Sequence, residues 1–227
     1  MLAGRATSTA VYAPRRHSDY PHDRADWFHD RARTDAVART GGDVKTPRAA
    51  PVWGASRLVA ERREDLVEAR LALFDPARTY RYLLEHRWGS VAPMVLVMLN
   101  PSTADATRDD PTMRRALRFA RREGCGGLIV VNLFALRATD PAALTSHPDP
   151  VGSDNDQVLC AAVGRGNLVV AGWGAHGTPH GRDRAVLRLL APVRLRCLGL
   201  TAGGQPRHPL YLPATAPLTD YRPQGEA

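Results

Sequence analysis

The sequence predicts an α/β domain, a three-layer sandwich in which a central, mainly parallel β-sheet carries helices on both faces. Two observations support this fold class. Short continuous runs of aliphatic residues recur along the second half of the chain, as expected for strands buried on both faces. Segments with apolar residues at helical spacing alternate with these runs, which indicates amphipathic helices that cross back over the sheet.

The chain before this alternation divides into three parts. Residues 1–55 have few aliphatic residues and no sustained period, so we expect a disordered tail or an extension from a misplaced start codon. A basic arm for nucleic acid is the alternative, but acidic residues interrupt its arginines throughout. Residues 56–70 predict a linker or short helix, and residues 71–84, with a turn at Asp75, predict a β-hairpin. Residues 71–222 are expected to form a single α/β domain.

The alternation itself supplies four strands and three helices. The predicted strands are 91–99, 128–131, 168–173 and 195–200. The predicted helices begin at Asp110-Pro111, at 153 and at 182. In sheets of this kind, ligands bind outside the carboxyl ends of the strands, so the residues that follow each strand are the candidates for a site.

Composition restricts the class of protein. A net charge of +8 and a pI near 10.1 favour a phosphate-bearing partner. Cys125, Cys160 and Cys197 are far apart in the sequence, which argues against a zinc ribbon, an iron–sulfur cluster and a disulfide framework. No signal peptide is evident and no apolar run reaches about 18 residues. We therefore expect a cytoplasmic protein that uses no cofactor and makes no membrane contact.

Polar residues follow the first predicted strand of this sheet. Asn100, Ser102 and Asp105 supply hydrogen-bonding side chains, and Pro101 fixes the turn that holds them. This pattern predicts one wall of a binding site. A turn that only caps the following helix is the alternative.

The other strand ends carry further candidates. Asn132 presents a carboxamide, whose donor and acceptor suit a base edge or a neighbouring loop, and Arg137 behind it suits a phosphate or carboxylate. Trp173-Gly174 places an indole, either a core residue or a stacking platform, beside a glycine. Beyond the fourth strand, His208 follows Arg207, and a neutral imidazole there would donate a hydrogen bond to an anionic leaving group.

Two weaker patterns are typical of metal sites. His176 and His180 are four residues apart, but the glycine and proline between them exclude a regular helix. Asp105, Asp109 and Asp110 would suit Mg²⁺ beside a phosphate, yet Asp109 or Asp110 is better placed to cap the following helix. We therefore predict no metal site.

The stretch from Tyr80 to Tyr211 resembles a bacterial family known as domain of unknown function 1643. The matching motifs are LNPSTAD at 99–105, DDPT at 109–112, NLFA at 132–135, WG at 173–174 and RHPLY at 207–211. The same order of motifs is similar, more distantly, to the uracil-DNA glycosylase superfamily. This second resemblance implies a uracil-DNA glycosylase-like fold, with an N-terminal hairpin added.

The glycosylase resemblance also implies roles for individual residues. Asn100 would position water, Asn132 would grip the base and His208 would meet the leaving group. Phe134 and Tyr211 are alternatives for the aromatic side chain that stacks on the base. Because an amide cannot take up a proton as a carboxylate does, slow turnover is expected.

One departure from the superfamily concerns the last motif. The chain lacks the Ser-Pro that normally follows His-Pro, so the wedge that replaces a flipped base is either Leu210 or Leu212. The same resemblance implies that Trp173-Gly174 supports the pocket.

Together these observations predict a domain that recognises a nucleobase in nucleic acid or a nucleotide, with hydrolysis of an N-glycosidic bond as the candidate reaction. The alternative is a non-catalytic protein that binds nucleotides or modified bases. A third hypothesis is a hydrolase or transferase that acts on a free nucleotide and holds its phosphate with Arg137 and Arg207.

Overall fold

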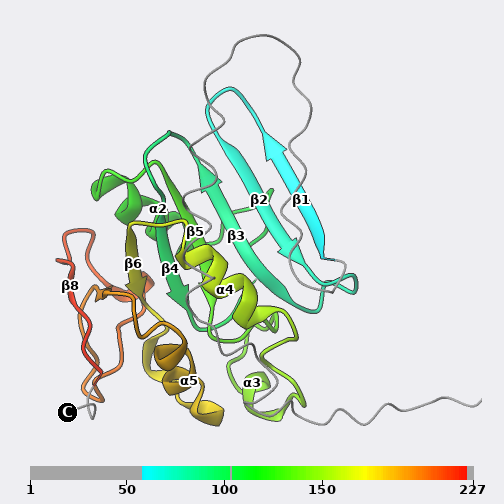
Figure 1. The fold of residues 1–227 in the computed structure, drawn as a ribbon, viewed down its shortest axis with the longest axis vertical. Coiled ribbons are helices and arrows are strands. Elements are labelled where there is room, and N and C mark those ends of the chain that lie inside the picture. Colours follow the sequence, from blue (N-terminus) through cyan, green and yellow to red (C-terminus); the bar gives the residue numbers. More distant parts are fainter. Residues whose placement is uncertain (1–57, 103, 224–227) are drawn as a thin grey trace, which may run out of the picture. The chain divides into compact units, whose positions relative to one another are not determined.

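The computed structural model describes residues 58–102 and 104–223, which contain one eight-stranded β-sheet with helices against both faces (Figure 1). The strands are β1 (Val59–Glu64), β2 (Ala69–Phe74), β3 (Arg81–Arg87), β4 (Met94–Met98), β5 (Gly127–Asn132), β6 (Leu168–Ala171), β7 (Leu195–Cys197) and β8 (Thr219–Asp220). Their order across the sheet is β1-β2-β3-β5-β4-β6-β7-β8. The tail predicted for residues 1–55 lies outside the described residues.

The sheet is mixed rather than mainly parallel. Strands β5, β4, β6 and β7 run parallel to one another, whereas β1–β2, β2–β3, β3–β5 and β7–β8 are antiparallel pairs. The expectation of a mainly parallel sheet is therefore wrong, because the N-terminal strands join the same sheet through β5 and β8 adds an antiparallel strand at the other edge. A three-layer sandwich built on a mainly parallel sheet is not confirmed.

The four aliphatic runs of the sequence do form the parallel centre of this sheet. Every residue of β4 is buried, because β5 and β6 flank the strand and its side chains alternate between two apolar clusters. Met98, for example, lies in one cluster and Val97 in the other. Since parallel strands point the same way, the ends of β4, β5, β6 and β7 meet at one edge of the sheet, as predicted.

The hairpin predicted within residues 71–84 is confirmed as β2 and β3. Its turn is fixed by Asp75, whose carboxylate accepts hydrogen bonds from the backbone N–H groups of Ala77 at 3.1 Å and Tyr80 at 2.6 Å. A shift of register between Leu73 and Phe74 marks a bulge where β2 meets the start of β3.

The short helix or linker predicted for residues 56–70 is wrong. This segment forms β1, which pairs with β2 along its whole length, and the turn to β2 is held by Asp65, whose carboxylate accepts the N–H groups of Val67 and Glu68. β1 is the edge strand and most of its side chains are exposed. Because such a strand buries neither face, its sequence lacks the alternation that would have indicated it.

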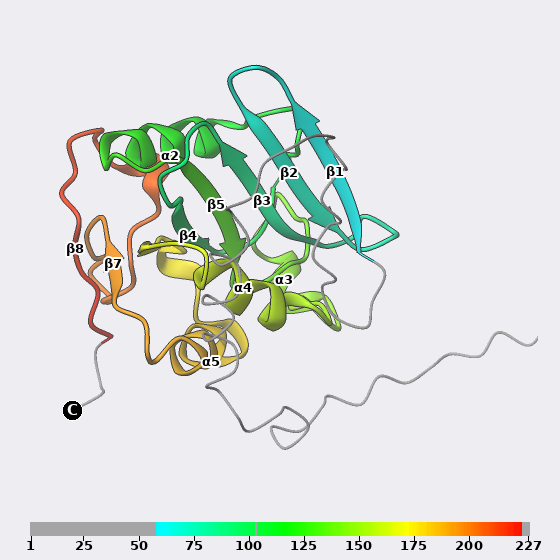
Figure 2. The same ribbon diagram turned by 45° about the horizontal axis from the view of Figure 1, so that its top comes forward.

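The helices divide between the two faces of the sheet (Figure 2). They are α2 (Pro111–Arg122), α3 (Ala143–Ser146), α4 (Asn155–Val163) and α5 (Arg182–Leu189). Side chains of α2 pack into one cluster, and those of α4 and α5 pack into the other. The three predicted helices are confirmed, and Asp110 is the N-cap of α2, with its carboxylate accepting the N–H of Met113 at 2.8 Å.

The structure shows the state of the three cysteines and the lengths of the helices. Cys125, Cys160 and Cys197 are free and buried. Burial raises the pKa of Cys160 to about 12, so this thiol stays protonated at neutral pH. Within residues 58–102 and 104–223, no helix is long and apolar enough to cross a membrane.

Candidate functional site

A cavity of about 600 Å³ lies at the edge of the sheet where the parallel strands end. Each of the four predicted strand ends contributes to its lining, through Asn100, Asn132, Trp173 and Thr201. Side chains on the α2 side of the sheet, Met98 among them, form its apolar wall. The cavity therefore lies where the rule that ligands bind at the carboxyl ends of such strands predicts a site.

Asn132 is the most unusual residue in the lining of this cavity. Its side chain is 1% exposed, and its amide nitrogen has no hydrogen-bond partner among the described residues. The strand end that carries it is held by Asn155, at the start of α4, whose amide donates to the carbonyls of Asn132 at 3.0 Å and Leu133 at 2.9 Å. A buried donor without a partner is costly, so this amide is suited to a ligand that supplies an acceptor.

Asn100 is anchored by its own amide group. Its nitrogen donates to the carbonyl oxygens of Pro101 at 3.1 Å, Leu136 at 3.5 Å and Ala138 at 2.8 Å. These contacts identify which end of the amide is the nitrogen and leave the oxygen Oδ1 without a donor in the described part of the chain. Asn100 therefore presents an acceptor at the cavity, which can orient a water molecule or a ligand N–H.

The loop after β7 brings His208 to the cavity. The imidazole Nδ1 accepts the N–H of Leu210 at 3.3 Å, so the neutral ring carries its proton on Nε2. Burial lowers the pKa of His208 below its ordinary value of 6.5, an effect that the negative charge of Asp110 partly opposes. At neutral pH, His208 is thus an uncharged hydrogen-bond donor in the cavity lining.

Two further residues of the same loop also line the cavity. Tyr211 is 76% exposed and its ring centroid lies 5.6 Å from that of His208. Arg207 is exposed, and its backbone N–H donates to the carbonyl of Gly199 at 2.9 Å. An accessible phenol ring beside His208 offers a surface on which a flat ligand can stack.

Trp173 and Gly174 support this loop. The indole of Trp173 is 1% exposed, donates to the side-chain oxygen of Gln205 at 2.7 Å and meets the ring of Tyr221 edge-on, so the core interpretation describes it better than a stacking platform. Gly174 has φ +76°, which favours glycine, and its N–H donates to Pro206 at 2.8 Å. A Cβ on Gly174 would lie 3.4 Å from the Cβ of His208, an ordinary contact distance, so the positive φ rather than lack of space is what favours glycine at this position.

Several predicted site residues do not line this cavity. Pro101 is buried and serves through its carbonyl, which accepts the N–H of Ala138 at 3.0 Å. Phe134 is fully buried in the cluster on the other face of the sheet, so it cannot stack on a ligand in this cavity. Asp105 closes a turn by accepting hydrogen bonds from Thr107 and Arg108.

Arg137 belongs to a neighbouring hollow, which shares Ser102 with the main cavity. Arg137 lines a second cavity of about 440 Å³, where its guanidinium donates to the carbonyl of Arg78 at 3.2 Å and lies over the ring of Phe74. Ser102 lines both cavities, and so does Ala138. The two hollows therefore share a wall, and Arg137 lies beyond it.

Sequence reasoning missed Arg81, a buried cation in the wall of the main cavity. Arg81 is 4% exposed, and its guanidinium donates to the carbonyl of Ala104. Burial lowers its pKa to about 10, an effect that the charge of Asp110 opposes. No sequence signal marks it, because an arginine between two tyrosines in a hairpin normally faces solvent.

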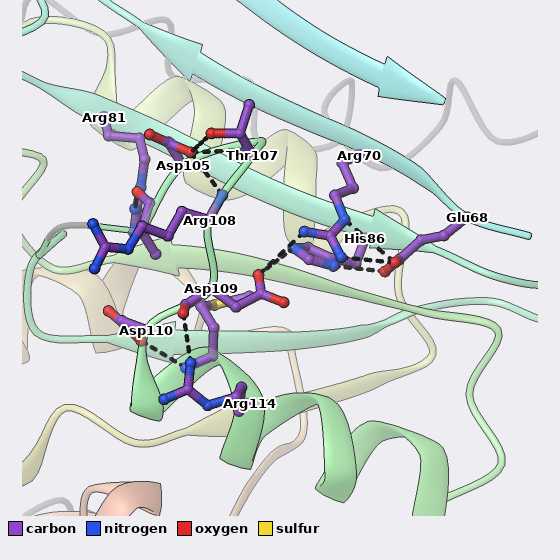
Figure 3. A network of polar contacts seen from close by, with 12 residues as sticks. Glu68, Arg70, Arg81, His86, Asp105, Thr107, Arg108, Asp109, Asp110 and Arg114 are labelled. Carbon is purple, nitrogen blue, oxygen red and sulfur yellow. Dashed lines mark hydrogen bonds and ion pairs between the residues drawn. The ribbon is translucent and has the colours of Figure 1, made fainter. Parts of the chain in front are cut away.

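Asp110 lines the cavity as well as capping α2, and its neighbour Asp109 joins a separate buried cluster. Figure 3 shows His86 between the carboxylates of Asp109 and Glu68, with Arg70 beside both. The imidazole is fully buried, with Nδ1 2.6 Å from Glu68 and Nε2 3.3 Å from Asp109. This cluster ties β2 and β3 to the segment that leads into Asp110.

The histidines and carboxylates considered for metals are dispersed. His176 lines the main cavity, whereas His180 is directed to the carbonyl of Leu144 at 3.1 Å. Among the residues that the structure describes, no group of three or more His, Cys, Asp or Glu side chains is arranged to hold a metal ion.

Comparison with known proteins gives one result. A family model described as "Protein of unknown function (DUF1643)" matches residues 81–210, more than half of the 227 residues. No curated protein and no solved structure matches the chain. The matched segment begins at Arg81 and contains Asn100, Asn132 and His208, so it includes the main polar residues of the cavity.

Proposed function

The chain belongs to the DUF1643 family, and since that membership specifies no reaction, we propose from the cavity itself that the protein recognises a nucleobase and hydrolyses the N-glycosidic bond that holds it. The observation that carries this proposal is the buried amide nitrogen of Asn132, which has no hydrogen-bond partner among the described residues. A carboxamide offers a donor and an acceptor in one plane, which matches the edge of a base. The exposed ring of Tyr211 is available to stack on such a flat ligand.

The other polar groups of the cavity fit the hydrolysis. As the bond to the sugar breaks, negative charge develops on the base, and the Nε2–H of His208 is a donor suited to stabilise it. Asn100 presents an oxygen that no donor of the described residues occupies, and this oxygen can accept a hydrogen bond from the attacking water. Because neither Asn100 nor a neutral His208 takes up a proton readily, the water is oriented rather than deprotonated, and turnover is slow.

The arrangement of the layers supports the glycosylase-like version of the fold. The parallel centre of the sheet has α2 on one face and α4 and α5 on the other, and the cavity lies where the parallel strands end. The antiparallel strands β1, β2 and β3, which include the predicted hairpin of β2 and β3, are then an addition at one edge.

The charge of α2 favours a partner that carries phosphate. Its twelve residues include five arginines and no acidic residue. α2 begins at the cavity, where Thr112 contributes to the lining. A basic helix beside a base-sized hollow suits the backbone of a nucleic acid or the phosphate of a nucleotide.

The experiment is a survey of single- and double-stranded oligonucleotides, each with one uracil, other deaminated base or hypermodified base. Abasic product is detected as strand cleavage after alkali. We expect product from at least one substrate, and we expect Asn132→Leu to abolish it while Gln157→Leu, a similar change on α4 away from the cavity, leaves it unaltered. If the cavity binds free nucleotides but no substrate yields abasic product, the hydrolysis proposal is wrong.

A non-catalytic binder of nucleotides or modified bases is the second candidate. The observation that favours it is the use of the Asn100 amide to hold three backbone carbonyls, which is a structural role. This candidate predicts ligand binding by wild type with no product formed under any condition. The hydrolase predicts instead that a slow product-forming step accompanies binding.

A further inference from the structure

We propose that Arg81 makes part of this cavity a binding site for an oxyanion, so that the ligand is a phosphate-bearing nucleotide rather than a base or nucleoside. The inference rests on the proposed function for the base portion of the ligand. The oxyanion site itself depends only on Arg81 and its surroundings.

The first argument is the isolation of the Arg81 guanidinium. The side chain is 4% exposed, one nitrogen donates to the carbonyl of Ala104, and Nε has no hydrogen-bond partner among the described residues. Every ion pair of the described residues lies elsewhere, on other arginines or on His86. A buried cation without a counter-ion is strongly unfavourable, so an anionic ligand would relieve a cost that the empty cavity carries.

The second argument is the balance of charge around Arg81. Asp110 and Asp105 attract its positive charge and Arg137 repels it, but neither carboxylate forms an ion pair with it within the described residues. Asp110 is already occupied in capping α2 through Met113, and Asp105 in closing its own turn. The pKa of about 10 leaves Arg81 charged at neutral pH.

The third argument is what else lines the same cavity. Thr112 supplies a hydroxyl in the first turn of α2, a twelve-residue helix whose N-terminus carries partial positive charge. Arg207 and His208 line the cavity too. Among the described residues of the lining, two arginines, Arg81 and Arg207, face a single carboxylate, that of Asp110. A guanidinium is planar and has several N–H donors, which suits the oxygens of a phosphate.

The base and the phosphate would then bind at neighbouring points of one cavity. Asn132 ends β5 and Arg81 starts β3, and because these two strands are antiparallel neighbours, the two residues lie beside each other at the same edge of the sheet. A cavity of about 600 Å³ is within the range that holds ligands of nucleotide size. The phosphate can come from a free mononucleotide or from a phosphodiester in a strand, and the two sources are separated by experiment.

The experiment compares ligands on the wild-type protein by isothermal titration calorimetry. The ligands are the common nucleosides and deoxyuridine, their 3′- and 5′-monophosphates, and dinucleoside monophosphates. We expect one phosphate form to bind about tenfold to hundredfold more tightly than its nucleoside. A preference for the monophosphates identifies a free nucleotide, and a preference for the dinucleoside monophosphates identifies a strand. Equal affinity for nucleoside and nucleotide would overturn the inference, and this comparison needs no variant.

Variants assign the effect to Arg81. Arg81→Gln keeps a donor for Ala104 but removes the charge, so the affinity for nucleotide should fall to that for nucleoside. Arg81→Lys should retain part of the preference, and Arg188→Gln, an exposed change on α5, should retain all of it. A preference that survives in folded Arg81→Gln protein would contradict the assignment.

Inorganic phosphate separates this inference from the proposed function. Phosphate should raise the melting temperature of wild type relative to chloride at equal ionic strength, and should not do so for Arg81→Gln. If phosphate acts through Arg81 while no base, nucleoside or nucleotide binds, the oxyanion site stands and the proposed function fails. If bases bind and phosphate has no effect, the proposed function stands and the oxyanion site fails. If nothing binds, both are wrong.

Discussion

The amide nitrogen of Asn100 lies 2.8 Å from the carbonyl oxygen of Ala138, and this hydrogen bond joins the loops that follow β4 and β5. A second bond runs between the same loops in the other direction, from the N–H of Ala138 to the carbonyl of Pro101 at 3.0 Å. Together they hold one wall of the cavity closed and fix which end of the Asn100 amide faces the cavity.

Replacement of Asn100 should therefore lower the stability of the protein, whatever effect it has on a reaction. Asn100→Ala removes the donor to three carbonyls and should lower the free energy of unfolding by about 1–2 kcal/mol. Asn100→Asp should cost more at pH 7.5, because a carboxylate cannot donate and its charge would face the same carbonyl oxygens. Urea denaturation monitored by circular dichroism measures both effects.

The pH dependence of the aspartate variant provides the check. A protonated carboxyl can donate where a carboxylate cannot, so the stability of Asn100→Asp relative to wild type should rise as the pH falls from 7.5 to 4.5. An Asn100→Asp protein as stable as wild type at pH 7.5 would show that the amide nitrogen does not hold these carbonyls.

Asn132→Leu should separate stability from function. The wild-type amide nitrogen is buried and has no partner within residues 58–102 and 104–223, so an apolar side chain of similar size should leave the free energy of unfolding unchanged or raise it by up to about 1 kcal/mol. Ligand binding in the cavity should be lost. Thermal melting and calorimetry with the best nucleotide ligand measure the two effects, and Gln157→Leu is the matched control. Loss of stability together with binding would indicate that Asn132 is structural.

Much of the sheet was predictable, and the reasons lie in particular strands. β4 and β5 lie at the centre of the sheet with every residue buried, so apart from Asn132 at the end of β5 their residues are apolar and the sequence shows continuous apolar runs. β1 was not predictable, because it is an exposed edge strand and its charged residues show no alternation of apolar and polar side chains. The order of strands, with β5 between β3 and β4, depends on packing between distant segments rather than on any local pattern.

The candidate site was predictable where it depends on strand ends. Asn132 and His208 could be found because polar residues after apolar strands stand out. Arg81 was hidden, since the loop that covers it, around Ala104, follows more than twenty residues later in the sequence. Phe134 was wrongly placed because the alternation of β5 ends at Asn132, and the chain then turns its side chains toward the other face.

The protonation of His208 should govern both ligand binding and stability at acidic pH. Burial lowers the pKa of His208 from 6.5, so the unfolded chain takes up a proton before the folded protein does. Stability from this residue is therefore complete above about pH 6.5 and is lost as the pH falls toward the lowered value. Wild type should lose more stability than His208→Gln between pH 7.5 and 5, measured by urea denaturation. Parallel losses in the two proteins would contradict this account.

The contact between the buried His86 and the partly buried Asp109 should contribute to stability in a pH-dependent way. The contact with His86 lowers the pKa of Asp109, while burial opposes it, so this carboxylate stabilises the fold above its ordinary pKa of 3.8. Asp109→Asn should lower the free energy of unfolding by about 1 kcal/mol at pH 7, since the site is partly solvated. The difference should shrink as the pH falls below 3.8 toward the lowered pKa of the folded protein, and it should disappear once the carboxyl is protonated in both states. A constant difference across this range would show that charge is not the cause.

Gly177→Ala should disturb the cavity by displacing the indole of Trp173, which is part of its lining. A Cβ at residue 177 would lie 2.3 Å from Cδ1 and 2.7 Å from Nε1 of the Trp173 indole, far closer than packing allows, and the indole has no free space because it is 1% exposed. The ring must move, which breaks its 2.7 Å hydrogen bond to Gln205 and shifts the strand end that holds Gly174 against the His208 loop. We expect a loss of about 1–3 kcal/mol in stability, as for other overpacked cores, and weaker ligand binding. Gly181→Ala is the matched control, since a Cβ there meets no atom within 4 Å and only its positive φ opposes the change. If Gly177→Ala is no less stable than that control, the indole is not held as tightly as the geometry indicates.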